Sequence, residues 1–171
     1  SNGTEKKGLF HLWCTLSNQE DKYKEDFSLI DVIETLPAYT TTGVSESRAL
    51  LKIKTTDHAV LKSNYQKVFL AEWEENKSSL KEKYGICEYE AISNNGTKET
   101  RNVSDFSISG KGGLKILFKD AEKQNLAYIW MRGSGTEPVF RVLCDVKGNN
   151  SEMENDLLQW HSQMISKADI Q

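Results

Sequence analysis

The sequence predicts an α+β domain in which a four-stranded, mainly antiparallel sheet is covered by helices. Four short runs rich in β-branched and aromatic residues follow one another in the second half of the chain. The segments between them contain the Gly, Asn and Asp of hairpin and loop connections, which favours antiparallel pairing. Long amphipathic patterns of helical period precede and follow these runs, so we expect helices to cover the sheet.

The N-terminal part of the chain is expected to lie outside this domain. Ser1 and Asn2 resemble the residues that removal of an affinity tag leaves behind. Residues 7–16, KGLFHLWCTL, are apolar at helical spacing but have no helix-start signal, as expected for the end of a longer element. We therefore interpret residues 1–26 as a tag remnant followed by the end of a preceding domain.

A short helix and a linker are predicted over residues 27–48. Ser28 is a suitable N-cap, Asp31 can complete a capping box with it, and Pro37 ends the helical pattern. The stretch TTTGVSESR that follows is rich in Thr, Ser and Gly, which is typical of a linker. The boundary of the C-terminal domain is expected within residues 38–48.

Residues 49–171 are expected to form the C-terminal domain. The run ALLKIKT is a candidate first strand, and an aromatic stripe at helical spacing predicts a long helix over residues 63–84. Further strands are predicted at residues 86–92, 114–118, 126–131 and 139–146. A last amphipathic helix is predicted over residues 151–168, where Ser151 and Glu154 fit a capping box.

Composition excludes several classes of protein. No apolar run of the 171-residue chain approaches the roughly 20 residues that span a bilayer, so no membrane partner is expected. The formal net charge of −3 argues against general nucleic-acid binding, which clustered Lys and Arg would supply. Cys14, Cys87 and Cys144 lack CxxC spacing, which suits reduced thiols in a cytoplasmic protein. The three histidines are scattered, and no metal site is predicted.

A polar loop between two predicted strands, RGSGTEP at residues 132–138, is the candidate binding site. Gly133 and Gly135 permit positive φ angles, which would let successive backbone N–H groups converge on one point. The hydroxyls of Ser134 and Thr136 add donors to the same concavity. A concave group of donors of this kind favours an anion. The alternative is an ordinary solvent-exposed connection, for which Gly and Ser are also typical.

Two arginines flank this loop and favour the anion-binding interpretation. Arg132 enters it from one strand and Arg141 lies just inside the next. Their planar guanidinium groups could hold a phosphate through bidentate, charge-assisted hydrogen bonds. Glu137 could orient an arginine and Pro138 could fix the backbone at the loop exit, so both are interpreted as supporting residues.

The segment RGSGTEPVFRV resembles the R-x-S-G-T-E-P-x-x-R signature of the C-terminal, fourth domain of the α-D-phosphohexomutases, the family of phosphoglucomutases and phosphomannomutases. LPAYTTTG also resembles the family's passage from its third domain into its fourth, and the resemblance covers about residues 27–168. It implies a TATA-binding-protein-like fold. It also implies that phosphate is bound by Arg132, Gly133, Ser134, Gly135, Thr136 and Arg141. The segment 93–110 is long compared with the family pattern.

The resemblance implies an isomerase of the phosphotransferase type, which moves a phosphoryl group between C1 and C6 of a hexose through a bisphosphorylated sugar. The expected partners are a hexose phosphate or bisphosphate and the N-terminal mutase domains. The family's catalytic phosphoserine loop and magnesium loop do not occur here, so no catalytic residue, metal ligand or cofactor is expected in this chain. Mg²⁺ is implied for the full-length enzyme. The alternative function is a stand-alone anion-binding or protein-interaction module without catalysis.

Overall fold

Residues 2–169 are described by a computed structural model with two compact units, one ending at Ala38 and the other beginning at Tyr39. The division falls at the start of the predicted linker, so residues 39–48 belong to the second unit. In the described part of the chain, no helix has both the length and the apolar character needed to cross a membrane.

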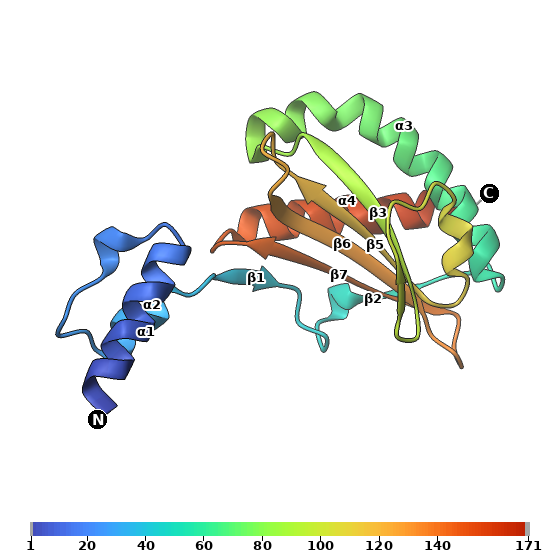
Figure 1. Cartoon of the computed structure of the whole chain (residues 1–171). Coiled ribbons are helices and arrows are strands. Elements are labelled where there is room, and N and C mark those ends of the chain that lie inside the picture. The colour runs from blue at the N-terminus through green and yellow to red at the C-terminus, as the bar shows by residue number, and fades with distance from the viewer. Residues whose placement is uncertain (1, 170–171) are drawn as a thin grey trace. The chain divides into compact units, whose positions relative to one another are not determined.

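The first unit contains two helices, α1 (Asn2–Leu16) and α2 (Leu29–Thr35), with a 3₁₀ turn at Glu20–Lys22 between them (Figure 1). The capping box predicted before α2 is confirmed. The Ser28 hydroxyl accepts a hydrogen bond from the Asp31 N–H, and the Asp31 carboxylate accepts one from the Ser28 N–H at 2.6 Å. These reciprocal bonds satisfy N–H groups that the first helical turn leaves unpaired.

The second unit is α+β, as predicted, and its sheet is antiparallel in every described pairing. The prediction of four strands is wrong, because the described residues form seven. They are β1 (Tyr39–Thr41), β2 (Leu50–Lys52), β3 (Glu88–Asn95), β4 (Lys98–Thr100), β5 (Gly113–Lys119), β6 (Asn125–Gly133) and β7 (Val139–Lys147). The order is β1-β7-β6-β5-β3-β4, and β2 also pairs with β7.

Strand β2 lies in the run ALLKIKT that was predicted as a first strand, whereas β1 and β4 come from segments whose composition indicated loops. Tyr39 pairs with Lys147, so the supposed linker begins as an edge strand along β7. In the 93–110 segment, Asn95 pairs with Lys98 across a tight turn, where Gly96 has a φ of 60°. A left-handed φ is readily adopted by glycine, so this residue permits the hairpin that adds β4. Three-residue strands are too short to show an alternating apolar pattern, and tertiary pairing decides their structure.

Two long helices, α3 (His58–Tyr84) and α4 (Ser151–Asp169), cover one face of the sheet (Figure 1). Side chains alternate along β6, so Ile129 and Met131 are fully buried beneath the helices, whereas Trp130 and Arg132 face the opposite side. The core therefore lies in a single layer between sheet and helices. The face that holds Arg132 is not covered by a helix within this unit.

The capping box predicted for α4 is wrong. The cap is Asn150, whose Oδ1 accepts a hydrogen bond from the Met153 N–H at 3.0 Å. Glu154 instead turns inward, is 5% exposed, and accepts hydrogen bonds from the Thr42 hydroxyl at 2.6 Å and from Arg48 at 3.2 Å. A buried carboxylate requires such partners. Glu154 thus fastens α4 to the segment that links β1 to β2.

Candidate anion-binding site

The predicted loop joins β6 to β7 and has a small hydrogen-bond framework of its own. The Ser134 N–H donates to the Val139 carbonyl at 2.9 Å, and the Val139 N–H donates to the Glu137 carbonyl at 2.8 Å. The Thr136 N–H donates to the Ser134 hydroxyl at 3.4 Å. Within residues 2–169, the N–H groups of Gly135 and Glu137 donate to no protein acceptor. These two backbone donors are available to a ligand.

The loop glycines differ from the prediction, because neither Gly133 nor Gly135 has a positive φ. The converging arrangement of backbone N–H groups expected from left-handed glycines is therefore not how this loop is built. Gly133 is required by packing instead: a Cβ placed on it would lie 2.1 Å from the His58 ring. A Cβ on Gly135 would meet nothing within 4 Å. The two glycines thus have different structural roles.

A cavity of about 320 Å³ lies against the loop and is lined by three segments of the chain. Its residues are Thr56, His58, Lys111, Ser134, Gly135, Thr136, Glu137 and Pro138. The structure therefore brings together most of the loop residues that the sequence singled out. It adds the start of α3 on one side and the turn before β5 on another.

Helix α3 begins at this cavity, earlier than the residue 63 that the sequence predicted. Asp57 is its N-cap and accepts hydrogen bonds from the N–H groups of Ala59 at 2.9 Å and Val60 at 3.2 Å. The start of a 27-residue helix has a positive electrostatic potential, which favours a nearby anion. The aromatic stripe that predicted α3 starts only at Tyr65, so the apolar pattern missed the first turns.

His58, the first residue of α3, is 8% exposed and packs edge-on against Phe140 at 5.1 Å between ring centroids. Its Nδ1 is fully buried and has no hydrogen-bond partner in the described part of the chain. Burial lowers the pKa of His58, and the positive charges of Lys62 and Lys111 lower it further. The imidazole is therefore held neutral beside a cavity with cationic surroundings.

Lys62 lies one turn further along α3 and is fully buried. Its Nζ donates hydrogen bonds to the Gly110 carbonyl at 2.8 Å and the Gly112 carbonyl at 2.6 Å. Burial, and then the charge of Arg132, lower the pKa of Lys62 to about 8. These bonds hold the turn from which the exposed Lys111 lines the cavity. The buried ammonium group of Lys62 adds a second positive charge behind this turn.

Arg132 and Arg141 are on the open face of the sheet next to the loop, not in the lining of the cavity. They are direct cross-strand partners, and both are exposed. Within residues 2–169, neither forms an ion pair with a carboxylate. Arg132 is close enough to Lys62 to lower its pKa. The predicted arginines therefore add positive charge at the edge of the site.

Sequence reasoning missed Thr56, His58, Lys62 and Lys111. Lys111 had a weak signal, because a lysine between glycines in SGKGG is exposed by its own turn. His58 was treated as one of three scattered histidines. Lys62 had no signal, since a lysine in a helical pattern ordinarily lies on the solvated face. Only the tertiary structure, in which α3 approaches the β6–β7 loop and β5 pairs with β6, identifies these residues as neighbours of the predicted site.

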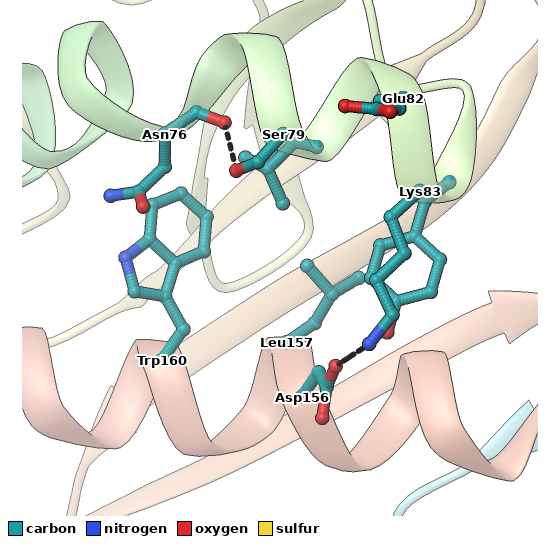
Figure 2. Close-up of a pocket in the computed structure, with 9 residues that line it drawn as sticks. Asn76, Ser79, Glu82, Lys83, Asp156, Leu157 and Trp160 are labelled. Atoms are coloured by element: carbon teal, nitrogen blue, oxygen red, sulfur yellow. Dashed lines mark hydrogen bonds and ion pairs between the residues drawn. The ribbon is translucent and has the colours of Figure 1, made fainter.

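A different cavity, of about 370 Å³, lies between α3 and α4 and has mixed apolar and charged walls (Figure 2). Lys83 donates a hydrogen bond to Asp156 there at 2.8 Å, and Leu157 and Trp160 extend from α4 toward α3. These contacts join the two helices. The cavity shares no lining residue with the β6–β7 loop, so it is separate from the candidate anion site.

A scan against models of known protein families found no match to the chain, and a search of curated protein sequences found none either. Among residues 2–169, no group of three or more His, Cys, Asp or Glu side chains is placed to hold a metal ion. The three cysteines are free thiols, of which Cys14 and Cys144 are buried.

Proposed function

We propose that this chain is the C-terminal, substrate-phosphate-binding domain of a phosphohexomutase that acts on glucose or mannose phosphates. The full-length protein would be a cytoplasmic isomerase of the phosphotransferase type. Its reactive phosphoserine and its Mg²⁺ would belong to N-terminal mutase domains, and this chain alone would be inactive. Strands β3, β5, β6 and β7 with helices α3 and α4 would correspond to a TATA-binding-protein-like core, to which β1, β2 and β4 are additions.

The observation that supports this proposal is the concentration of uncompensated cations and free donors around the β6–β7 loop. Lys62 has only carbonyl partners, and Arg132 has no carboxylate partner in the described residues. Lys111 and the N-terminus of α3 line the same cavity as the loop. A phosphate dianion would neutralise these charges and accept hydrogen bonds from the Gly135 N–H and the loop hydroxyls.

In a mutase, such a site would grip the phosphate that is not reacting. Binding at a distance from the reacting atoms contributes by fixing the position of the sugar before phosphoryl transfer. A bisphosphorylated intermediate must present each of its two phosphates in turn. The same loop would then hold either phosphate, because it recognises the phosphoryl group and leaves the sugar to other domains.

A stand-alone anion-binding module is the second candidate. It is favoured by one observation: every residue of the site lies in the second unit, so no other domain is needed to form it. The two candidates differ in whether hexose-phosphate isomerisation depends on this site in the full-length protein. If the chain is instead a protein-interaction module, the loop should not bind phosphate.

The test has two parts. In the isolated chain, titration with inorganic phosphate should perturb the NMR signals of the 134–138 loop in the wild type, and much less in Arg132→Ala. Lys98→Ala, which removes an exposed lysine on β4, is the matched control and should bind as the wild type does. In the full-length protein, interconversion of glucose 1-phosphate and 6-phosphate should depend on Arg132. Phosphate binding without any mutase activity of the full-length protein would support the module and contradict the mutase.

A further inference from the structure

We propose that His58 forms part of the wall of the phosphate site beside the β6–β7 loop, and that it takes up a proton when the anion binds. This inference rests on the proposed phosphate-binding function and assigns a residue outside the loop to it. Anion affinity would then be coupled to pH through one side chain at the start of α3.

The two ring nitrogens of His58 have different environments. Nδ1 is buried against Gly133, where not even a methyl group fits between ring and backbone. Nε2 has no hydrogen-bond partner within residues 2–169 and, in contrast to Nδ1, it is not fully buried. His58 lines the cavity that also contains the loop. Nε2 is therefore the ring nitrogen that can donate a hydrogen bond to an anion in this cavity.

The charges around His58 determine when it is protonated. Asp57 and Lys62 come from its own helix, Lys111 from the turn before β5, and Glu137 from the loop. The charge of Arg132 on β6 acts on Lys62 behind them. With the cavity empty, burial and the lysines disfavour an imidazolium ion, and Asp57 offsets this only in part.

A bound dianion reverses this balance. It introduces two negative charges that face Lys111 and the His58 ring together, so the imidazolium becomes the favoured form. Thermodynamic linkage then requires that the anion bind more tightly where His58 is protonated. Because Nδ1–H would still lack a partner, proton uptake is expected to move the ring slightly away from Gly133, toward the anion.

Sulfate is the appropriate probe, because it stays a dianion over the pH range in which phosphate monoesters change charge. Between about pH 7 and about pH 5.5, Lys62 remains protonated and sulfate affinity of the isolated chain should rise roughly three- to tenfold. His58→Gln, which keeps a side-chain donor but cannot titrate, should bind sulfate with little pH dependence. His11→Gln removes an exposed histidine of the first unit and should keep the wild-type pH profile.

A second measurement needs no substitution. The ¹³Cε1 signal of His58 in the wild-type chain should titrate at a higher pH in the presence of sulfate than without it, while that of the buried His161 should not change. Sulfate binding that weakens in Arg132→Ala, together with an unchanged His58 titration, would overturn this inference and leave the phosphate function standing. Absence of sulfate and phosphate binding at every pH would overturn both.

Discussion

Arg132 on β6 and Arg141 on β7 are direct cross-strand partners, so two exposed guanidinium groups occupy adjacent positions on one face of the sheet. Like charges that face each other across a strand pair destabilise a sheet. Glu90 on the same sheet is paired with both Arg101 and Lys119, so the fold elsewhere compensates its charges. The uncompensated pair beside the β6–β7 loop is expected where an anion is bound at the expense of some stability.

Replacing Arg132 should affect binding much more than folding. If the proposed function holds, Arg132→Ala in the full-length protein removes a charge-assisted contact worth about 1.5–3 kcal/mol, and kcat/KM for the hexose phosphate should fall about ten- to hundredfold. The melting temperature should stay the same or rise slightly, because repulsion from Arg141 is relieved. Arg132→Lys should restore part of the loss, since it keeps the charge without the bidentate geometry. Unchanged kinetics with a much lower melting temperature would identify the loop as a structural turn.

The two loop glycines should respond differently to the same substitution. Gly133→Ala places a methyl group into the His58 ring and should destabilise the second unit by roughly 1–3 kcal/mol. Gly135→Ala enters open space and should change the free energy of unfolding by less than about 0.5 kcal/mol. Urea unfolding of the two variants is the measurement. Equal destabilisation would show that the close approach of His58 to Gly133 does not persist in solution.

Lys62 should make the stability of the domain depend on alkaline pH. Its folded-state pKa of about 8 lies below the unfolded value near 10.5, so the unfolded chain binds more protons between these limits. The free energy of unfolding due to Lys62 therefore rises with pH, by about 1.5 kcal/mol between pH 8 and pH 9.5.

Lys62→Met isolates this contribution. Cys144 acts in the opposite direction over the same range, because burial raises its pKa and the unfolded thiol loses its proton first. The difference in unfolding free energy between wild type and variant cancels the Cys144 contribution. That difference should shift in favour of the wild type as pH rises from 8 to 9.5. A difference independent of pH would contradict the burial of a charged Lys62.

Glu154 should be the most sensitive carboxylate of α4. Glu154→Ala removes the nearer of the two acceptors of the buried Thr42 hydroxyl, leaving only the Cys144 carbonyl at 3.2 Å. It also removes one of the two carboxylates that bind Arg48, so a loss of about 1–3 kcal/mol is expected. Glu152→Ala on the same helix turn removes an exposed carboxylate and should cost less than about 1 kcal/mol. Thermal unfolding of both variants checks this, and a larger loss for Glu152→Ala would contradict the anchoring role.

The predictable part of this structure depends on long, periodic patterns. The helices α3 and α4 and the strands β3, β5, β6 and β7 all overlap the predicted segments, because each is long enough for its apolar period to show. The capping box at Ser28 is local chemistry and was predictable for that reason. The box at Ser151 was not, because Glu154 has a stronger interaction with Thr42, which is distant in sequence.

The candidate site, too, was predictable only where its residues are contiguous in sequence. The β6–β7 loop is contiguous in sequence, so its glycines, hydroxyls and arginines could be recognised together. The other walls include His58 and Lys111. His58 reaches the loop through the packing of α3 on the sheet, and Lys111 through the pairing of β5 with β6. Even for the loop, the sequence assigned Gly133 to a conformational role, whereas the structure assigns it to the close approach of the His58 ring.

The pairing of β1 and β2 with β7 has a consequence for how the chain is made. Thr40 and its partner Gly148 are 108 residues apart in sequence, and β7 is the last strand of the sheet. At the usual synthesis rate of about 5–20 residues per second, residues 39–52 leave the ribosome some seconds before any partner strand exists. The nascent chain must therefore keep two strands unpaired until β7, which directly follows the β6–β7 loop, has been translated. Completion of the sheet and completion of the candidate anion site thus both come late in synthesis.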